Sequence, residues 1–300
     1  MTRALRLGTR GSQLATIQSE LVANRLRALG HAVDLVPVVT DGDRRPAGTE
    51  PGVGIFVTAL EQALTDGEVD LAVHSAKDVP LDTRAGLVVA AFPDRADPRD
   101  ALVTAAGGSS LERLPAGASF GTDSPRRAGF VLHVRPDLRQ RPIHGNVDTR
   151  LRRLDEGAVD ALVLAAAGLD RLGAGDRIDQ RLAAQVVAPA PGQGALAVQC
   201  RADDVRTLEA VTALDAPDIR LSVVTERRVL EVTGGSCRAP VGALASVIGG
   251  RLCLVAAAAA PDGSERCVLS LEDEPTEAGG MRLAEQAGRE LMKKVGSLVA

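Results

Sequence analysis

The sequence predicts an α/β protein with two α/β lobes and a third, smaller α+β domain. Short apolar strands alternate with helix patterns along the chain, which is typical of α/β folds. The 300 residues also exceed the usual size of one hydrophobic core. Two breaks, at residues 94–99 and 189–194, would let the chain cross back into the first lobe after building the second. The predicted domains are residues 1–95 with 195–215, residues 96–194, and residues 216–300.

The first lobe is predicted to open with strand and helix units of the kind that build a parallel sheet. Residues 5–7 and 33–38 are predicted strands, and Ser12 is expected to cap the helix between them. The expected apolar positions of that helix are Leu14, Ile17, Leu21 and Leu26. A second helix, at residues 55–64, leads into an apolar strand at residues 69–73.

The second lobe and the third domain continue this alternation. The predicted elements of the second lobe are strands near residues 101–104 and 119–120 and helices near residues 126–133 and 147–154, with Ser124 and Asn146 as caps. An apolar strand at residues 195–198 follows the second break. The predicted elements of the third domain are a helix ending at Val232, strands at residues 244–247, 252–257 and 267–271, and a closing helix at residues 280–295.

The composition argues against nucleic-acid binding and against a membrane span. The formal net charge is −4, with no Trp or Tyr and four Phe, whereas nucleic-acid binding needs a basic surface and usually aromatic rings for stacking. No apolar run approaches the roughly 20 residues of a membrane span. The start of the chain enters a strand pattern instead of a signal-peptide core. We therefore expect a cytoplasmic protein with a small-molecule ligand and without a nucleic-acid or membrane partner.

The four cysteines differ in their surroundings. Cys200, Cys253 and Cys267 lie in alternating strand patterns and are expected to be buried and inert. No CxxC or Cys/His pairing is present, so the sequence indicates neither a metal site nor a disulfide framework. Cys237 instead follows a Gly-Gly-Ser loop and precedes Arg238, a context in which a thiol can be exposed and its thiolate favoured by a cation.

Residues 74–80, with the sequence HSAKDVP, place Lys77 beside Asp78 at the end of an apolar strand. Ligands of open α/β sheets bind outside the carboxyl ends of the strands, and Pro80 stops the strand from running on regularly. Lys77 is the only lysine before residue 293, although arginine is abundant, so a special role is indicated. An ordinary surface ion pair is the alternative interpretation.

Three predicted helix starts carry arginine. In residues 121–127, Ser124 can cap the helix and Pro125 suits its first turn. The same arrangement recurs at residues 144–150 and, more weakly, at residues 8–12. A helix amino terminus with an arginine beside it is a binding site for anions such as carboxylates. For any one of these helices a solvated arginine face is the alternative, but three such loops around one cleft favour carboxylate binding.

The chain resembles the porphobilinogen deaminase family over nearly its whole length. The matching segments, in order, are residues 7–12, 74–80, 97–101, 121–127, 145–150, 167–173, 191–195 and 235–237. The resemblance implies two hinged lobes similar to periplasmic binding proteins plus the third domain, in a monomer. It also implies a transferase, hydroxymethylbilane synthase, that condenses porphobilinogen head to tail into a linear tetrapyrrole with release of ammonia, in heme biosynthesis. A dipyrromethane cofactor would be joined to Cys237 through a thioether.

The resemblance further implies roles for residues of this chain. Asp78 is the expected catalytic residue, because a fixed carboxylate stabilises the positive charge that forms on the pyrrole rings. The expected cofactor-binding residues are Cys237, Lys77, Ser75, Thr122, Asp123, Ser124, Arg126, Arg127, His144, Gly145 and Arg150. The expected substrate-binding residues are Arg10, Ser12, Gln18, Arg171, Gln193 and Gly194. No metal is expected.

The chain departs from the family's pattern at a few positions. His144 stands where the family commonly has arginine, and a neutral imidazole cannot make the bidentate fork to a carboxylate. Asp123 stands where the family usually has serine, and it adds a negative charge to the loop expected to bind carboxylates. Thr49 and Val53 occupy positions where lysines are frequent. The first two departures are predicted to weaken carboxylate binding.

These departures leave two alternatives to the heme-pathway enzyme. One is a diverged homologue that condenses a different pyrrole or performs fewer condensations. The other is a non-catalytic, two-lobed carboxylate-binding protein. The presence of Cys237 and Asp78 argues against the second alternative, since carboxylate binding requires neither residue.

Overall fold

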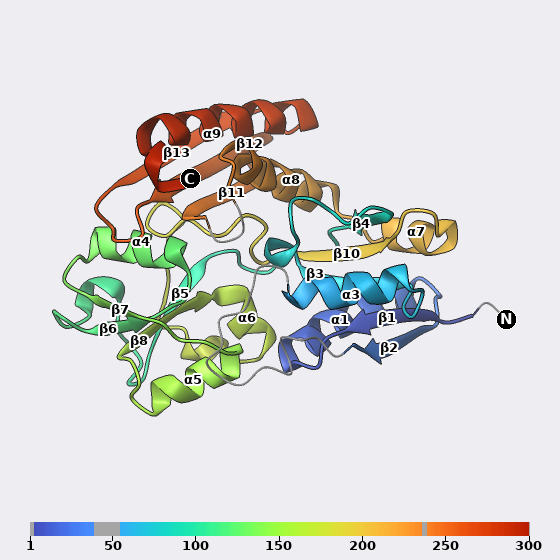
Figure 1. Cartoon of the computed structure of the whole chain (residues 1–300), viewed down its shortest axis with the longest axis horizontal. Coiled ribbons are helices and arrows are strands. Elements are labelled where there is room, and N and C mark those ends of the chain that lie inside the picture. Colours follow the sequence, from blue (N-terminus) through green and yellow to red (C-terminus); the bar gives the residue numbers. More distant parts are fainter. Residues whose placement is uncertain (1–2, 39–54, 236–238, 300) are drawn as a thin grey trace. The chain divides into compact units, whose positions relative to one another are not determined.

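The computed structural model describes residues 3–38, 55–235 and 239–299 (Figure 1). The chain divides into two compact units. The first unit comprises residues 1–95 and 195–220, and the second comprises residues 96–194 and 221–300. The second lobe and the third domain of the sequence prediction therefore belong to the same unit.

The first unit is built on a five-stranded sheet in the order β2-β1-β3-β10-β4. Its strands are β1 (Leu5–Thr9), β2 (Val33–Pro37), β3 (Leu71–Ser75), β4 (Leu87–Ala91) and β10 (Leu196–Arg201). β1 is parallel to β2 and β3, whereas β10 is antiparallel to both of its neighbours, β3 and β4. The predicted parallel arrangement holds for β1, β2 and β3, and β4 was not predicted.

Helices cover both faces of this sheet. α1 (Gln13–Ala28) and α7 (Val205–Thr212) pack on the face that carries Leu71 and Val73. α3 (Ile55–Thr65) packs on the opposite face, against Ala72. A three-residue 3₁₀ helix, η1 (Ala76–Asp78), directly follows β3.

The buried face of α1 differs from the prediction. Ser12 caps the helix as expected, accepting a hydrogen bond from the backbone nitrogen of Ala15 at 3.4 Å. Of the four predicted apolar positions, however, only Leu26 is buried, and Leu21 is 39% exposed. The buried residues are Gln18, Ser19, Val22, Ala23 and Leu26. The amino-terminal half of this face is polar because Gln18 contacts the end of β3, at Ser75.

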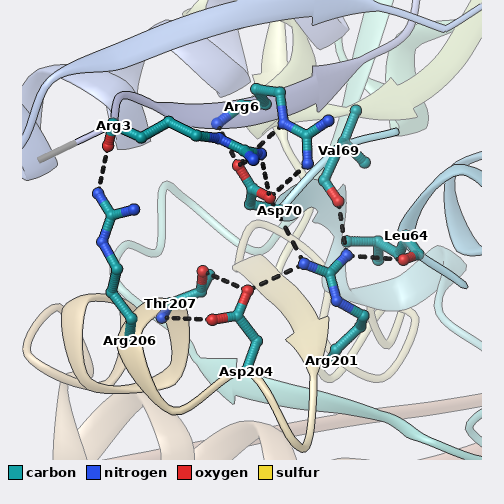
Figure 2. Close-up of polar contacts among 9 residues, drawn as sticks. All are labelled: Arg3, Arg6, Leu64, Val69, Asp70, Arg201, Asp204, Arg206 and Thr207. Atoms are coloured by element: carbon teal, nitrogen blue, oxygen red, sulfur yellow. Dashed lines mark hydrogen bonds and ion pairs between the residues drawn. The ribbon is translucent and has the colours of Figure 1, made fainter. Parts of the chain in front are cut away.

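A cluster of charged groups around Asp70 lies at the end of the sheet where β3 begins (Figure 2). The carboxylate of Asp70 accepts hydrogen bonds from the backbone and guanidinium of Arg6 and from Arg3, and Arg201 lies 3.4 Å from it. Arg201 also donates to two backbone carbonyls and to Asp204, the cap of α7. One carboxylate thereby ties β1, β3 and β10 together.

The second unit contains a five-stranded sheet with the same pattern of parallel and antiparallel strands, in the order β7-β6-β8-β5-β9. Its strands are β5 (Asp100–Thr104), β6 (Ser119–Gly121), β7 (Arg139–Arg141), β8 (Ala161–Ala165) and β9 (Gln180–Arg181). β6 is parallel to β7 and β8, and β5 is antiparallel to β8 and β9. Its helices are α4 (Pro125–Val134), α5 (Val147–Asp155) and α6 (Ala166–Arg171), with 3₁₀ turns η2 (Leu111–Arg113) and η3 (Gly175–Arg177).

The remainder of the second unit is a three-stranded antiparallel sheet with helices. Its strands are β11 (Val241–Ile248), β12 (Arg251–Ala259) and β13 (Arg266–Asp273). α9 (Glu277–Val299), kinked at Val295, packs along β12 and β13, and α8 (Pro217–Val232) precedes the sheet in sequence (Figure 1). The predicted class, α/β lobes with a smaller α+β domain, is confirmed.

The alanine run at the end of β12 has a packing role. Ala257 and Ala259 lie in the same core as Phe120 and Phe130 of the second lobe. Gly129, in α4, faces the backbone at Ala260 so closely that a β-carbon would collide with it. Small side chains on both elements therefore allow α4 to pack directly on the third domain's sheet.

Among the described residues, none of the helices combines the length and apolar character that a membrane crossing requires.

Candidate active site

In the first unit, the predicted catalytic residue lies in a turn at the carboxyl end of β3. The strand runs to Ser75, two residues further than predicted, and η1 then carries Lys77 and Asp78. The Asp78 carboxylate is exposed, while Lys77 is half-buried. Val79, directly after η1, is buried and anchors this turn to the protein interior. A carboxylate held on short, anchored backbone can meet a ligand at this edge without a large loss of backbone freedom.

Other predicted residues gather at the same edge. Gln18 donates from Nε2 to the Ser75 hydroxyl at 3.0 Å. The parallel register pairs Gly8 with Ala72, so Arg10, just after β1, lies alongside the end of β3. Ser12 follows at the start of α1. The structure thus brings all six predicted residues of this unit to the carboxyl ends of β1 and β3.

In the second unit, the arginines at the start of α4 contact a protein carboxylate. Nη1 of Arg126 lies 2.7 Å from one oxygen of Asp100, and Nη2 of Arg127 lies 2.8 Å from the other. Arg126 also donates to the carbonyl oxygen of Ala188. Burial alone would raise the pKa of Asp100, but the charges of the two arginines hold it well below its usual range. Both guanidinium groups are almost completely buried.

Sequence reasoning missed Asp100. It lies in the matching segment at residues 97–101, yet no role was predicted for it. The signal was present, because a carboxylate at the start of the apolar strand Asp100–Thr104 must be buried, and a buried carboxylate needs cations or hydrogen-bond donors around it. The sequence does not say which groups these are.

The Gln193 loop is joined to the same carboxylate. Nε2 of Gln193 donates to Asp100 at 3.0 Å and to the carbonyl oxygen of Pro98 at 2.8 Å. The carbonyl oxygen of Gly194 accepts from Arg171 at 2.8 Å. Gly194 has φ +86°, and a β-carbon there would lie 2.5 Å from the oxygen of Ala96, so no other residue fits without strain.

A second carboxylate that sequence reasoning missed holds this loop to the third domain. Glu226 of α8 is fully buried. Its oxygens accept hydrogen bonds from the backbone nitrogens of Gly192, at 2.7 Å, and of Ala245 in β11, at 2.8 Å. Glu226 therefore fixes the Gln193 loop relative to the domain that carries Cys237.

Two of the departures from the family pattern, Asp123 and His144, lie against each other. Nδ1 of His144 is 2.9 Å from Oδ2 of Asp123, without the alignment of a hydrogen bond. Nη2 of Arg150 is 3.6 Å from the same oxygen, and Oδ1 accepts from the backbone nitrogen of Ile143 at 2.8 Å. Arg150 also donates from Nε to the carbonyl oxygen of Gly145 at 2.8 Å. Asp123 thus joins the two predicted carboxylate-binding loops.

The predicted cap forms at the start of α4 but not at the start of α5. Ser124 caps α4, accepting from the backbone nitrogen of Arg127 at 3.4 Å, and Pro125 occupies the first turn. The buried hydroxyl of Thr122 accepts from the nitrogen of Ser124 at 3.2 Å. Asn146 stands at the capping position of α5, but its side chain makes no capping hydrogen bond, so that part of the prediction is wrong.

Cys237 lies outside the described residues, as do Thr49 and Val53. Of the other cysteines, Cys200 is fully buried, and burial raises the pKa of its thiol to about 11. Cys267 is also buried, whereas Cys253 is only half-buried, contrary to the prediction. Within the described ranges, no group of three or more His, Cys, Asp and Glu side chains is arranged to hold a metal ion.

Comparison with known proteins gives one family for both parts of the chain. Residues 5–209 match the family model described as porphobilinogen deaminase, dipyromethane cofactor binding domain, and residues 220–295 match porphobilinogen deaminase, C-terminal domain. A porphobilinogen deaminase of Acidothermus cellulolyticus is 47% identical over 289 residues, covering 93% of this chain and 87% of the relative. One of Syntrophotalea carbinolica is 45% identical over 289 residues, covering 94% and 91%.

Solved structures show only a distant likeness. A nutrient binding protein from Burkholderia cenocepacia bound to methionine aligns with a TM-score of 0.45 and 16% identity, covering 72% of this chain and 93% of that one. The family assignment therefore depends on the sequence matches.

Proposed function

Because this chain belongs to the porphobilinogen deaminase family, we propose that it is a hydroxymethylbilane synthase that condenses porphobilinogen head to tail into a linear tetrapyrrole. Each condensation releases ammonia, and the pathway served is tetrapyrrole and heme biosynthesis. The observation that carries the proposal is the match of both family domains, over residues 5–209 and 220–295.

The charged groups of the second unit suit a dipyrromethane, which carries several carboxylates. At the start of α4, the guanidinium groups of Arg126 and Arg127 share a single carboxylate, Asp100, and at the start of α5 Arg150 lies 3.6 Å from Asp123. Burial and the nearby charge of Arg127 lower the pKa of Arg150, and a bound carboxylate would offset the repulsion between these two guanidinium groups. When bound through Cys237, the dipyrromethane supplies the primer to which pyrroles are added.

Residues of the first unit are proposed to act on the incoming pyrrole. A porphobilinogen that has lost ammonia is an electrophilic cation, and its attack by the preceding ring places positive charge on the pyrrole nitrogens. Asp78 stabilises this charge and accepts a proton as the ring becomes aromatic again. Arg10, at the same edge of the sheet, binds the acetate and propionate arms of the incoming pyrrole, and Lys77 binds a carboxylate of the dipyrromethane.

Intact-mass measurement and product analysis test the function. The purified protein should exceed its sequence mass by two pyrrole units and should release a linear tetrapyrrole from porphobilinogen. Cys237→Ser should lose the adduct, whereas the control Cys253→Ser should keep it. An unmodified mass without turnover would contradict the proposal and favour a carboxylate-binding protein, and a shorter product would favour a diverged homologue.

The catalytic assignment has its own test. Asp78→Asn should lower turnover by about 10²-fold or more, in the range of a lost acid–base or electrostatic group. The matched control is Asp82→Asn, because Asp82 is an exposed aspartate four positions further along the chain. An Asp78→Asn variant that keeps the adduct and half of the parent's turnover would assign the role to another residue.

We propose a monomer in the cytoplasm, without nucleic-acid or membrane partners, and with functional domains at residues 1–95 with 195–215, 96–194 and 216–300. The family resemblance supports this proposal, and sedimentation of the purified protein tests the monomer.

A further inference from the structure

Three buried polar side chains form a continuous row directly before the turn that carries Asp78. Nε2 of His74 lies 3.0 Å from Oε1 of Gln199, and Nε2 of Gln199 lies 2.9 Å from Oε1 of Glu61. His74 is 5% exposed, Gln199 0% and Glu61 8%. None of the three is among the predicted site residues. Three polar groups are costly to bury, so each must be satisfied by its neighbours.

The sheet explains why the three side chains meet. β10 pairs antiparallel with β3, with Gln199 opposite Ala72 and Ala197 opposite His74. Side chains alternate between faces, so His74 and Gln199 project from the same face as Ala72. That face is covered by α3, which carries Glu61 between the core residues Leu60 and Leu64.

The hydrogen bonds in this row have one direction. A carboxylate can only accept, so Glu61 takes a hydrogen from the amide NH₂ of Gln199. The amide oxygen of Gln199 then faces His74 and must itself accept. Nε2 of His74 therefore carries the hydrogen, and Nδ1 keeps its lone pair. The charge at Glu61 thereby sets the tautomer of a histidine on the far side of a glutamine.

The surroundings also keep this histidine neutral. Burial lowers the pKa of His74 to about 4, because its effect and that of the nearby charge of Arg10 outweigh the hydrogen bond to Gln199, which acts in the opposite direction. Glu61 is joined to the ring through Gln199, which hydrogen-bonds to both side chains. A neutral imidazole does not compete with Arg10 for the carboxylates that Arg10 is proposed to bind.

We propose that Glu61, Gln199 and His74 are positioning residues that hold His74 as the neutral Nε2–H tautomer and so fix the end of β3 and the turn bearing Asp78. His74 is followed immediately by Ser75, whose hydroxyl contacts Gln18, and by η1. A change in the histidine's tautomer would break its bond to Gln199 and loosen this strand end. The effect on turnover rests on the proposed function, but the tautomer itself does not.

The first test needs no variant of the row. Long-range ¹H–¹⁵N correlation spectra of the ¹⁵N-labelled holoprotein report the tautomer and charge of each of its four histidines. His74 is assigned by elimination, with His31→Gln, His133→Gln and His144→Gln. The expected result is an Nε2–H imidazole that does not titrate between pH 5.5 and pH 8. An Nδ1–H pattern, or titration in this range, overturns the proposal whether or not the protein turns over porphobilinogen.

The second test removes the charge that sets the direction. Glu61→Gln keeps the size of the side chain but can donate as well as accept, so His74 should become a mixture of tautomers. Backbone amide signals of residues 75–79 should shift, and kcat should fall about fivefold or more while KM changes less than twofold. The matched control is Glu68→Gln, since Glu68 is exposed. An unchanged tautomer with unchanged amide signals and kcat overturns the positioning role.

Discussion

At the scale of single residues, Asp123 has a different role from the one that its charge alone suggests. The sequence predicts that it repels the carboxylates of the ligand. In the structure its two oxygens contact Ile143, His144 and Arg150, so most of its charge is directed at protein groups. Asp123 and His144 are therefore a matched pair, and a change at one of them alters what the other contacts.

This pairing predicts non-additive effects on substrate binding. His144→Arg alone should change the KM for porphobilinogen less than twofold, because Asp123 will pair with the new guanidinium. Asp123→Ser alone leaves the nitrogen of Ile143 without its acceptor and should lower stability by about 1 kcal/mol. The double variant should lower KM by about tenfold. Steady-state kinetics of the four proteins measure the coupling, and strictly additive changes in log KM would refute the pairing.

The sequence predicted which residues belong to the site better than it predicted what those residues contact. The motif at residues 121–127 correctly predicts a capped helix start, since capping depends on local sequence. It does not predict that Arg126 and Arg127 face Asp100, which lies in a different strand. His74 and Gln199 are far apart in sequence, so only the strand pairing reveals their contact. Local patterns specify elements, whereas partners across a sheet depend on register.

At the scale of elements, Asp100 joins β5 to the first turn of α4. Asp100→Asn removes the charge that faces two buried guanidinium groups, and breaking a buried pair of this kind costs about 3 to 5 kcal/mol. Urea unfolding should show a clearly lower midpoint than the parent protein. The control is Asp137→Asn, because Asp137 pairs with Arg135 on the surface and should leave the midpoint nearly unchanged. Equal midpoints for both variants would contradict this interpretation.

The Asp70 cluster predicts a pH dependence of stability. Burial alone would raise the pKa of Asp70, but hydrogen bonds from Arg6 and the charges of Arg6 and Arg3 lower it to about 2. A carboxylate with a lowered pKa contributes stability that is complete above the unfolded value, near 4, and is lost as pH falls toward 2. Asp70→Asn should therefore be less stable than the parent at pH 7, and the difference should shrink below pH 4. Thermal unfolding between pH 2.5 and pH 7 measures this, and a constant difference would exclude the cluster as the cause.

There are physical reasons why the sequence did not predict some elements, among them β4 and α7. β4 and α7 are short, and they are held by β10 and the core around it more than by their own patterns. In α1, the hydrophobic period predicts Leu21 as buried, but Gln18 faces the end of β3 and turns the helix toward Val22 and Ala23. Where a helix borders a site, polar contacts decide which face is buried.

At the scale of the whole molecule, the sheet of the first unit is built from two distant parts of the chain. β10 lies between β3 and β4 and pairs with both. A fragment of residues 1–95 should therefore lack stable structure, because β3 and β4 would have no common partner. Addition of a peptide of residues 195–220 should restore ellipticity and cooperative unfolding, whereas a scrambled peptide should not. A cooperatively folded fragment 1–95 would show that β10 is dispensable.

The place of β10 has a consequence during synthesis of the protein. The ribosome makes β3 and β4 early, but the strand between them follows only after roughly 100 further residues, which takes about 5 to 20 seconds at typical rates of synthesis. Throughout that interval two apolar strand edges are open to other chains. The strands of residues 96–194 pair only with one another, so that sheet can form without waiting for a later strand. The sheet in the middle of the polypeptide can thus be complete before the sheet at its beginning, and the nascent amino-terminal segment is the one with strand edges that need protection by a chaperone.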